Sequence, residues 1–147
     1  MKINPFIVSH PSCKTPGQES EALQSLVDIG QTVLDAAGLE AEEGMQGINQ
    51  TETWIDASKS IRKWAMIENR PGRNFYMQKI FIKNKYKLVL YYADSMGELY
   101  DLKSDSDQMN NLWSIPDYQE IKNSLMQEMI FAEMDKDGVL RNRLSSS

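Results

Sequence analysis

The stretch Met77-Gln78-Lys79-Ile80-Phe81-Ile82-Lys83-Asn84-Lys85-Tyr86-Lys87-Leu88-Val89-Leu90-Tyr91-Tyr92 decides the fold of the second half of this chain. Its two halves, 77–83 and 86–92, are rich in β-branched and aromatic residues, and Asn84-Lys85 has the length of a two-residue hairpin loop. Further along, residues 98–102 alternate between apolar and polar side chains, as a half-buried strand does. Residues 64–67 form an apolar run before a Pro-Gly turn. The pattern predicts an antiparallel meander of three or four strands.

A long helix is expected after the meander. It opens near Ser114 and Pro116. Its apolar stripe recurs at helical spacing and comprises Tyr118, Ile121, Leu125, Met129 and Ala132. Ordering such a helix costs roughly 1–2 kcal/mol per residue in backbone entropy, so the stripe must be buried against another element. We therefore predict an α+β fold, a small antiparallel sheet packed against a long C-terminal helix.

The first third of the chain has a different pattern. Residues 5–9 form an apolar run bounded by proline, which predicts a strand buried on both faces. A helix is expected from about Asp28, which can cap its first amides, to Gly38. Residues 40–53 lack periodicity and are expected to be an exposed connection. Because a doubly buried strand needs neighbouring strands, we expect residues 1–52 to be a strand-helix remnant of a larger α/β domain, and residues 53–147 to be a separate sheet-and-helix subdomain.

Charge is distributed unevenly and excludes some partners. The 147 residues carry 16 Lys and Arg against 21 Asp and Glu, a net charge of −5, so no general attraction to nucleic acid is expected. Residues 19–52 contain eight acids and no Lys or Arg, whereas residues 68–92 have a balance of +5. The longest apolar runs are far shorter than the roughly 18 residues that a membrane span needs. The N-terminal residues show no signal-peptide pattern, so the compartment is left open.

Few residues are suited to catalysis. His10 is the single histidine and Cys13 the single cysteine, so neither a multi-histidine metal site nor an internal disulfide is possible. A nucleophile beside His10 would have to be Ser9, Ser12 or Cys13, but neighbours on an extended chain point in alternate directions. We expect a structural role for both His10 and Cys13.

The acidic clusters are poor matches to calcium loops. Residues 40–43 lack the alternating oxygen ligands and the closing glutamate of an EF-hand, and a solvated face is expected. Asp101, Asp105 and Asp107 have alternate spacing but no closing acid, so we expect them to form Asx turns. No metal ligand is predicted in this chain.

The turn after residue 68 is the most plausible anion contact. Arg70 and Arg73 present planar guanidinium groups that fit sulfate, phosphate or carboxylate, and Asn74 lies beside them. The alternative is a polar turn that keeps the edge of the sheet soluble.

Several of these segments resemble one known family. Glu98-Leu99-Tyr100-Asp101-Leu102, followed by Asp105, Asp107 and Asn110-Asn111-Leu112, is similar to the C-terminal signature of the type I sulfatases. Upstream, the segments 5–8, 25–29, 32–38, 44–47 and 85–88 resemble stretches of the same family in the same order. Gln31 departs from the pattern, because the family usually has proline there. The resemblance implies an alkaline-phosphatase-like sulfatase and covers nearly the whole chain.

The resemblance also implies which catalytic parts lie elsewhere. Sulfatases of this family use a formylglycine made from a C/S-x-P-x-R motif, together with a calcium ion held upstream of the matching region. Ser9-His10-Pro11-Ser12-Cys13 fails at its last position and Asn69-Arg70-Pro71-Gly72-Arg73 at its first. We therefore expect no catalytic residue, no metal ligand and no cofactor in this chain, with calcium and formylglycine in the full-length parent.

The resemblance suggests a function with two alternatives. The chain is interpreted as a C-terminal sulfatase piece that is inactive alone, with Glu68, Asn69, Arg70 and Arg73 facing the substrate. Its expected partners are the N-terminal sulfatase portion and a sulfated carbohydrate or aryl sulfate. The alternatives are half of a split sulfatase that is active after reassembly, and a non-catalytic module that binds sulfated glycans. Bacterial sulfatases of this type are often exported, although this chain shows no export signal.

Overall fold

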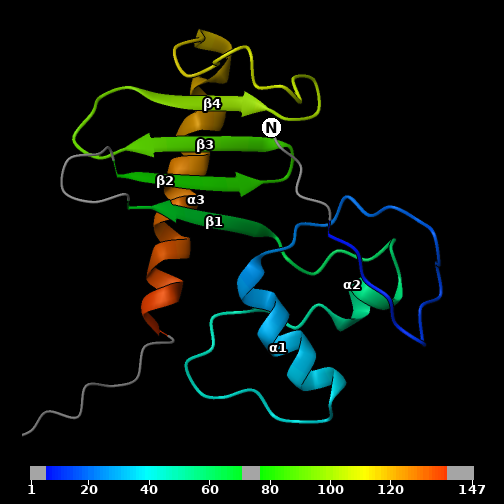
Figure 1. Ribbon diagram of the computed structural model, residues 1–147. Coiled ribbons are helices and arrows are strands. Elements are labelled where there is room, and N and C mark those ends of the chain that lie inside the picture. The colour runs from blue at the N-terminus through cyan, green and yellow to red at the C-terminus, as the bar shows by residue number, and fades with distance from the viewer. Residues whose placement is uncertain (1–5, 71–76, 139–147) are drawn as a thin grey trace, which may run out of the picture. The chain divides into compact units, whose positions relative to one another are not determined.

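A computed structural model describes residues 6–70 and 77–138 of the chain (Figure 1). Its described residues divide into two compact units, which we call the sheet unit (residues 63–130) and the α1 unit (residues 6–62 with 131–138). Each unit is described by itself. The expected domain boundary between residues 52 and 53 depends on residues 1–52 belonging to a larger α/β domain, and it stays a prediction.

The sheet unit contains four antiparallel strands in sequential order: β1 (Trp64–Asn69), β2 (Gln78–Lys83), β3 (Tyr86–Tyr91) and β4 (Gly97–Asp101). The predicted hairpin loop is confirmed, with Asn84 in the left-handed region at φ 53°. The register places Phe81 opposite Leu88 and Leu88 opposite Leu99, and all three side chains are fully buried. This row across the sheet is the centre of its core.

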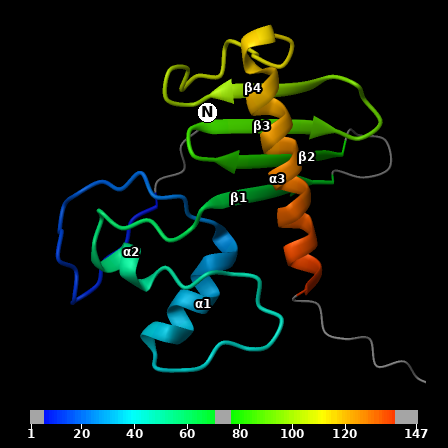
Figure 2. The same cartoon turned by 180° about the vertical axis from the view of Figure 1, so that it is seen from behind.

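Helix α3 (Gln119–Gly138) follows a short 3₁₀ turn, Pro116–Tyr118, and crosses one face of the sheet (Figures 1 and 2). Leu125 and Met129 are buried, as the predicted stripe requires, and each contributes about 1.5–3 kcal/mol. Glu128 of α3 pairs with Lys83. Because Lys83 and Phe81 are two residues apart on β2, the helix covers the face that carries Phe81. The predicted α+β fold, a sheet with a C-terminal helix, is confirmed.

The α1 unit contains helix α1 (Leu26–Ala36) and the short helix α2 (Thr51–Ile55). The predicted first helix is confirmed, but Asp28 is its third residue and not its cap. Ser25 is the N-cap, and its N–H donates to the Asp28 carboxylate at 3.1 Å. Gly38, at φ +70°, follows the helix end as expected.

Two expectations for the α1 unit were wrong. Residues 6–9 form no strand and Ile7 is 89% exposed, since none of the four strands of the described sheet pairs with this segment. Residue 5 lies outside the described residues. The segment 40–53 is not simply exposed, since Gln50 is fully buried and residues 51–53 begin α2. Polar side chains of this segment form hydrogen bonds to α1. Such contacts leave no periodic pattern in the local sequence.

Candidate functional site

The predicted substrate-facing turn begins where β1 ends. Glu68 and Asn69 are the last two residues of β1, and their cross-strand partners on β2 are Lys79 and Gln78. Arg70 follows directly. Arg73 lies outside the described residues, so the structure brings together three of the four predicted residues.

Glu68 holds two cations at this corner of the sheet unit. Its Oε2 accepts a hydrogen bond from Arg70 Nη2 at 2.7 Å, and its Oε1 lies 3.3 Å from Lys79 Nζ. The Arg70 side chain is 67% exposed and that of Glu68 is 28% exposed. The guanidinium is therefore oriented by one carboxylate while most of its surface faces solvent. An arginine has five N–H donors, so it can bind an anion and Glu68 together.

Lys79 was not among the predicted residues. Two cations and one carboxylate leave this corner with a net positive charge, which favours an anionic ligand. The signal that would have found Lys79 is its register opposite Glu68, since opposite charges favour each other across a strand pair. The predicted hairpin loop at Asn84-Lys85 fixes only the pairing of β2 with β3, so it does not specify the register of β1 with β2.

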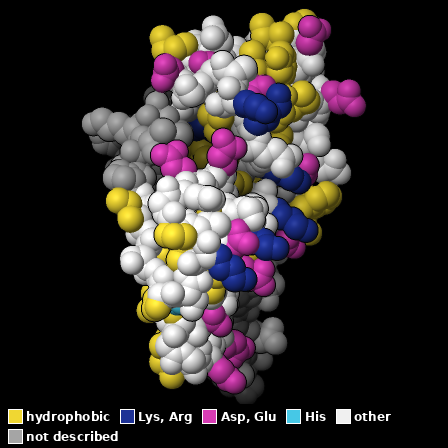
Figure 3. Space-filling view, turned by 90° about the vertical axis from the view of Figure 1, so that its right-hand side faces the viewer, with side chains coloured by type: hydrophobic (Ala, Val, Ile, Leu, Met, Phe, Trp, Pro, Cys, Tyr) yellow, Lys and Arg dark blue, Asp and Glu magenta, His cyan; other side chains and the backbone are white. Residues whose placement is uncertain are grey.

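Three other lysines of the sheet unit, Lys83, Lys85 and Lys87, have partners of their own. Lys85 Nζ lies 2.6 Å from Asp101 Oδ2, and Lys87 Nζ donates to Gln108 Oε1 at 2.6 Å. Lys83 pairs with Glu128. Figure 3 accordingly shows Lys and Arg side chains beside Asp and Glu side chains on one face of the molecule. Two acids from outside residues 68–92, Glu128 and Asp101, therefore offset part of the positive charge of that stretch.

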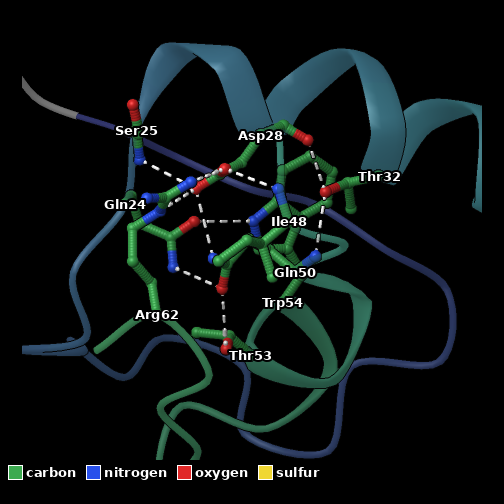
Figure 4. Close-up of polar contacts among 9 residues, drawn as sticks. All are labelled: Gln24, Ser25, Asp28, Thr32, Ile48, Gln50, Thr53, Trp54 and Arg62. Atoms are coloured by element: carbon green, nitrogen blue, oxygen red, sulfur yellow. Dashed lines mark hydrogen bonds and ion pairs between the residues drawn. The ribbon is translucent and has the colours of Figure 1, made fainter. Parts of the chain in front are cut away.

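The α1 unit contains a buried polar cluster centred on Asp28 (Figure 4). Asp28 is 1% exposed and forms a buried ion pair with Arg62, whose Nε donates to Asp28 Oδ2 at 2.7 Å. The N–H of Ile48 donates to Asp28 Oδ1 at 2.9 Å, and the side chain of Gln50 donates to Oδ2 at 3.2 Å. Thr32, also buried, accepts from the Gln50 N–H at 2.9 Å.

This cluster is suited to holding the chain together and not to catalysis. Burial raises the pKa of Asp28, but hydrogen bonds from Arg62 and the Ile48 amide, with the Arg62 charge, outweigh it and hold that pKa below its usual value. The carboxylate is therefore ionised and fully occupied by donors. Sequence analysis missed the pair, because Asp28 and Arg62 are 34 residues apart.

The remaining candidate residues have local partners. His10 Nδ1 accepts from the Ser12 N–H at 3.1 Å. Asp105 accepts from the amides of Met109 and Asn110 at 3.0 and 2.8 Å, and Asp101 accepts from two amides that follow it, so both form the expected local turn bonds. Within residues 6–70 and 77–138, no three His, Cys, Asp or Glu side chains are grouped to hold a metal ion. No helix of this part of the chain combines the length and apolarity needed to cross a membrane.

Comparisons with known proteins identify relatives along almost the whole chain. The family model described as "N-sulphoglucosamine sulphohydrolase, C-terminal" matches residues 2–135. The N-acetylglucosamine-6-O-sulfatase of Bacteroides thetaiotaomicron is 28% identical over 130 residues, which are 84% of this chain and 23% of that protein. Arylsulfatase K of Xenopus laevis is 28% identical over 118 residues, 74% of this chain and 22% of that protein. The chain thus spans about a quarter of the length of these two relatives.

A solved structure has the same fold. It is a protein in complex with its substrate D-glucosamine-2-N,6-O-disulfate, and it superposes with a TM-score of 0.77 at 24% identity. The superposition covers 94% of this chain and 29% of that protein.

Proposed function

We propose that this chain, which belongs to the N-sulphoglucosamine sulphohydrolase C-terminal family, helps a sulfatase to bind its sulfated substrate. The proposed binding residues lie at the end of β1. In this proposal the residues Glu68, Asn69, Arg70 and Arg73 face the substrate. The observation that carries it is the exposed guanidinium of Arg70, which Glu68 orients at 2.7 Å.

Each side chain of the corner has a distinct role in the proposal. Arg70 donates hydrogen bonds to oxygens of a sulfate group, because its planar fork matches that anion. Glu68 orients Arg70 and accepts a hydrogen bond from a substrate hydroxyl. Lys79, 3.3 Å from Glu68, holds that carboxylate in place. A sulfated sugar carries both of the groups that this corner is able to bind.

The chain is proposed to be inactive by itself. The 147 residues contain no C/S-x-P-x-R motif, from which the family's formylglycine nucleophile is made. Among the residues that the structure describes, no three acidic side chains are grouped to hold the family's calcium ion. Bond cleavage is assigned to the α/β portion of a sulfatase, with which this chain works in one polypeptide or as a reassembled pair.

The pairing of the lysines favours this function over a free sulfated-glycan module. Lys83, Lys85 and Lys87 are engaged with Glu128, Asp101 and Gln108, so the sheet does not present an open row of cations. Titration of the 147-residue chain with a sulfated oligosaccharide and its desulfated control separates the two functions. Tight binding of the sulfated form by the chain alone would favour the module.

The main test is the substitution Arg70→Ala in the assembled sulfatase. A hydrogen bond to a charged group contributes about 1.5–3 kcal/mol, so KM for the sulfated sugar should rise about 10- to 150-fold while kcat changes little. The matched control is Lys103→Ala, an exposed cation that follows β4 at the opposite edge of the sheet. An unchanged kcat/KM in Arg70→Ala would remove Arg70 from the site.

A further inference from the structure

A straight row of residues crosses the sheet from the corner at the end of β1. Each strand contributes one residue, and the register aligns them in the order Glu68, Lys79, Leu90 and Gly97. Neighbouring strands lie about 4.8 Å apart, so the row extends about 14 Å from β1 to β4. It therefore connects the proposed anion contact with the opposite edge of the sheet.

The side chains of this row point to the face of the sheet on which α3 lies. Lys79 is two residues before Phe81, whose face α3 covers, and side chains two residues apart on a strand share a face. Figure 2 shows the sheet from this side. Phe81, Leu88 and Leu99 of the neighbouring row are fully buried, whereas Lys79 and Leu90 keep part of their surface exposed. The row thus lies beside the covered core, where a ligand can reach it.

Trp113 occupies the β4 end of the row. A Cβ added to Gly97 would lie 2.5 Å from a ring carbon of Trp113, so the indole lies where a side chain of residue 97 would be. Because Gly97 and Leu99 share a face of β4, the indole lies on the same side of the sheet as α3. Trp113 is only half-buried. The exposed part of such a ring is a broad apolar surface, on which the C–H face of a sugar ring can stack.

Lys122 of α3 adds a cation beside Trp113. Its Nζ lies 4.6 Å from the centroid of the indole ring and donates to the carbonyl oxygen of Trp113 at 3.2 Å. It also donates to the side-chain oxygen of Gln119. These partners are uncharged, and in the part of the chain that the structure describes no acid pairs with Lys122. Lys83 and Lys85, by contrast, are paired with acids. The charge of Lys122 is therefore available to an anionic ligand.

We propose that Trp113 and Lys122 form a second sugar subsite, so that the ligand of the row is a sulfated oligosaccharide with one sulfated sugar at Arg70 and another sugar unit on Trp113. The inference rests on the proposed function and extends it from a single sugar to a chain of sugars. A cation lies at each end of the row, and Leu90 between them is apolar. A linear sulfated glycan has the same order of groups, because its anionic groups are separated by the apolar faces of its rings. A single sugar ring is shorter than the row and reaches only one end.

An NMR titration of the isotope-labelled 147-residue chain tests this subsite. The probes are D-glucosamine-2-N,6-O-disulfate, which is a single sugar, and a heparin tetrasaccharide, in which sulfated glucosamines alternate with uronic acids. We expect weak binding of both probes, with an affinity about fivefold higher for the tetrasaccharide, because only the longer ligand gains the contact with the indole. The signal of the Trp113 indole N–H should shift with the tetrasaccharide and not with the single sugar.

Three variants separate the contact with sugar from a structural role. Lys122→Met keeps the apolar stem, and it should weaken binding of the tetrasaccharide about three- to fivefold while the affinity for the single sugar is unchanged. Lys122→Arg should retain the affinity for the tetrasaccharide. The matched control is Lys103→Met, at an exposed cation that follows β4 at the end away from Gly97, and it should bind both probes as the unchanged chain does.

The outcomes distinguish this subsite from the proposed function. Equal affinity for the two probes, an indole signal that the tetrasaccharide leaves unmoved, or an equal loss of both affinities in Lys122→Met overturns the subsite. If Arg70→Ala loses the single sugar but no probe shifts the Trp113 signal, the proposed function stands and the subsite fails. If the tetrasaccharide shifts that signal as strongly in Arg70→Ala as in the unchanged chain, the subsite stands and the proposed role of Arg70 is contradicted.

Discussion

Replacement of Arg62 by methionine should destabilise the α1 unit far more than the loss of an ordinary ion pair. Methionine retains most of the apolar stem of the side chain and removes the charge. Asp28 would then be a buried carboxylate, 1% exposed, without its cation. Its remaining donors are the Ser25 and Ile48 amides and the Gln50 side chain, all neutral groups.

The expected cost follows from this burial. Removing one partner of a buried ion pair leaves an uncompensated charge and typically costs about 3–5 kcal/mol. The control is Lys136→Met in α3, because the pair of Lys136 with Glu133 lies at 3.2 Å with both side chains more than a quarter exposed. Such a surface pair contributes at most about 1 kcal/mol. The two substitutions should therefore differ several-fold in their effect on the free energy of unfolding.

Hydrogen exchange measured by NMR reports the effect within the α1 unit. The amides of Ile48 and Gln50 donate to Asp28 Oδ1 and Thr32 Oγ1, so both are protected only while the cluster is intact. A loss of 3 kcal/mol or more corresponds to exchange faster by at least about a hundredfold. A urea titration gives the accompanying change in the unfolding midpoint.

A double variant distinguishes the charge from the packing. Asp28→Asn combined with Arg62→Met retains a side-chain oxygen for the Ile48 amide and removes the buried charge, so it should be more stable than Arg62→Met alone. The reasoning is refuted if the single Arg62→Met variant loses less than about 1 kcal/mol, or if the two substitutions are simply additive.

Three further predictions use the same chain. Gly47→Ala should destabilise the α1 unit by about 1–3 kcal/mol or more in urea unfolding, because a Cβ there would lie 2.2 Å from the backbone oxygen of Val27; a variant as stable as the original would refute this close approach. The free energy of unfolding should fall as the pH drops below about 4, because the pKa of Asp28 is lowered in the folded chain and the unfolded chain binds the proton first. Asp28→Asn should flatten this part of the pH profile. An unchanged profile in Asp28→Asn would contradict this role of Asp28. The hydrogen bond to Glu98 raises the pKa of Tyr91 to about 12, and burial also raises the pKa of Tyr100. An ultraviolet titration should therefore show a phenol near pH 12 that Tyr91→Phe removes. The contribution of Tyr91 to stability is present below pH 10 and lost as the pH rises through 12, and a titration unchanged by Tyr91→Phe would contradict this.

The sheet unit could be predicted from the sequence because its contacts follow from local patterns. Runs of β-branched and aromatic residues predicted β2 and β3, period-two alternation predicted β4, and the two-residue connection at Asn84 set the register of the hairpin. The spacing of Leu125 and Met129 identified the helix face that meets the sheet. Arg70 and Glu68 were placed at the end of β1 by the turn that follows them.

The α1 unit was predicted only in part, because its interior is polar. The sequence identified the helix correctly and expected Asp28 to cap it, whereas the structure buries Asp28 and Thr32 within the unit. Gln50 lies in a segment that looked like an exposed connection and is fully buried. The burial of polar side chains leaves no periodic pattern in the sequence, because it depends on hydrogen-bond and ion-pair partners that are distant along the chain.

By itself the sequence determined the strands and the long helix of the sheet unit, their order, helix α1 and the family to which the chain belongs. These properties depend on side-chain periods and turn residues within about 20 positions of one another. The tertiary structure alone decided that Arg62 reaches Asp28, that Lys79 joins Arg70 at Glu68, and that α1 buries Asp28 and Thr32. The physical reason is that an ion pair forms only between groups that are close in space. Whether two residues distant in sequence come close depends on the fold of the chain between them, which neither residue specifies.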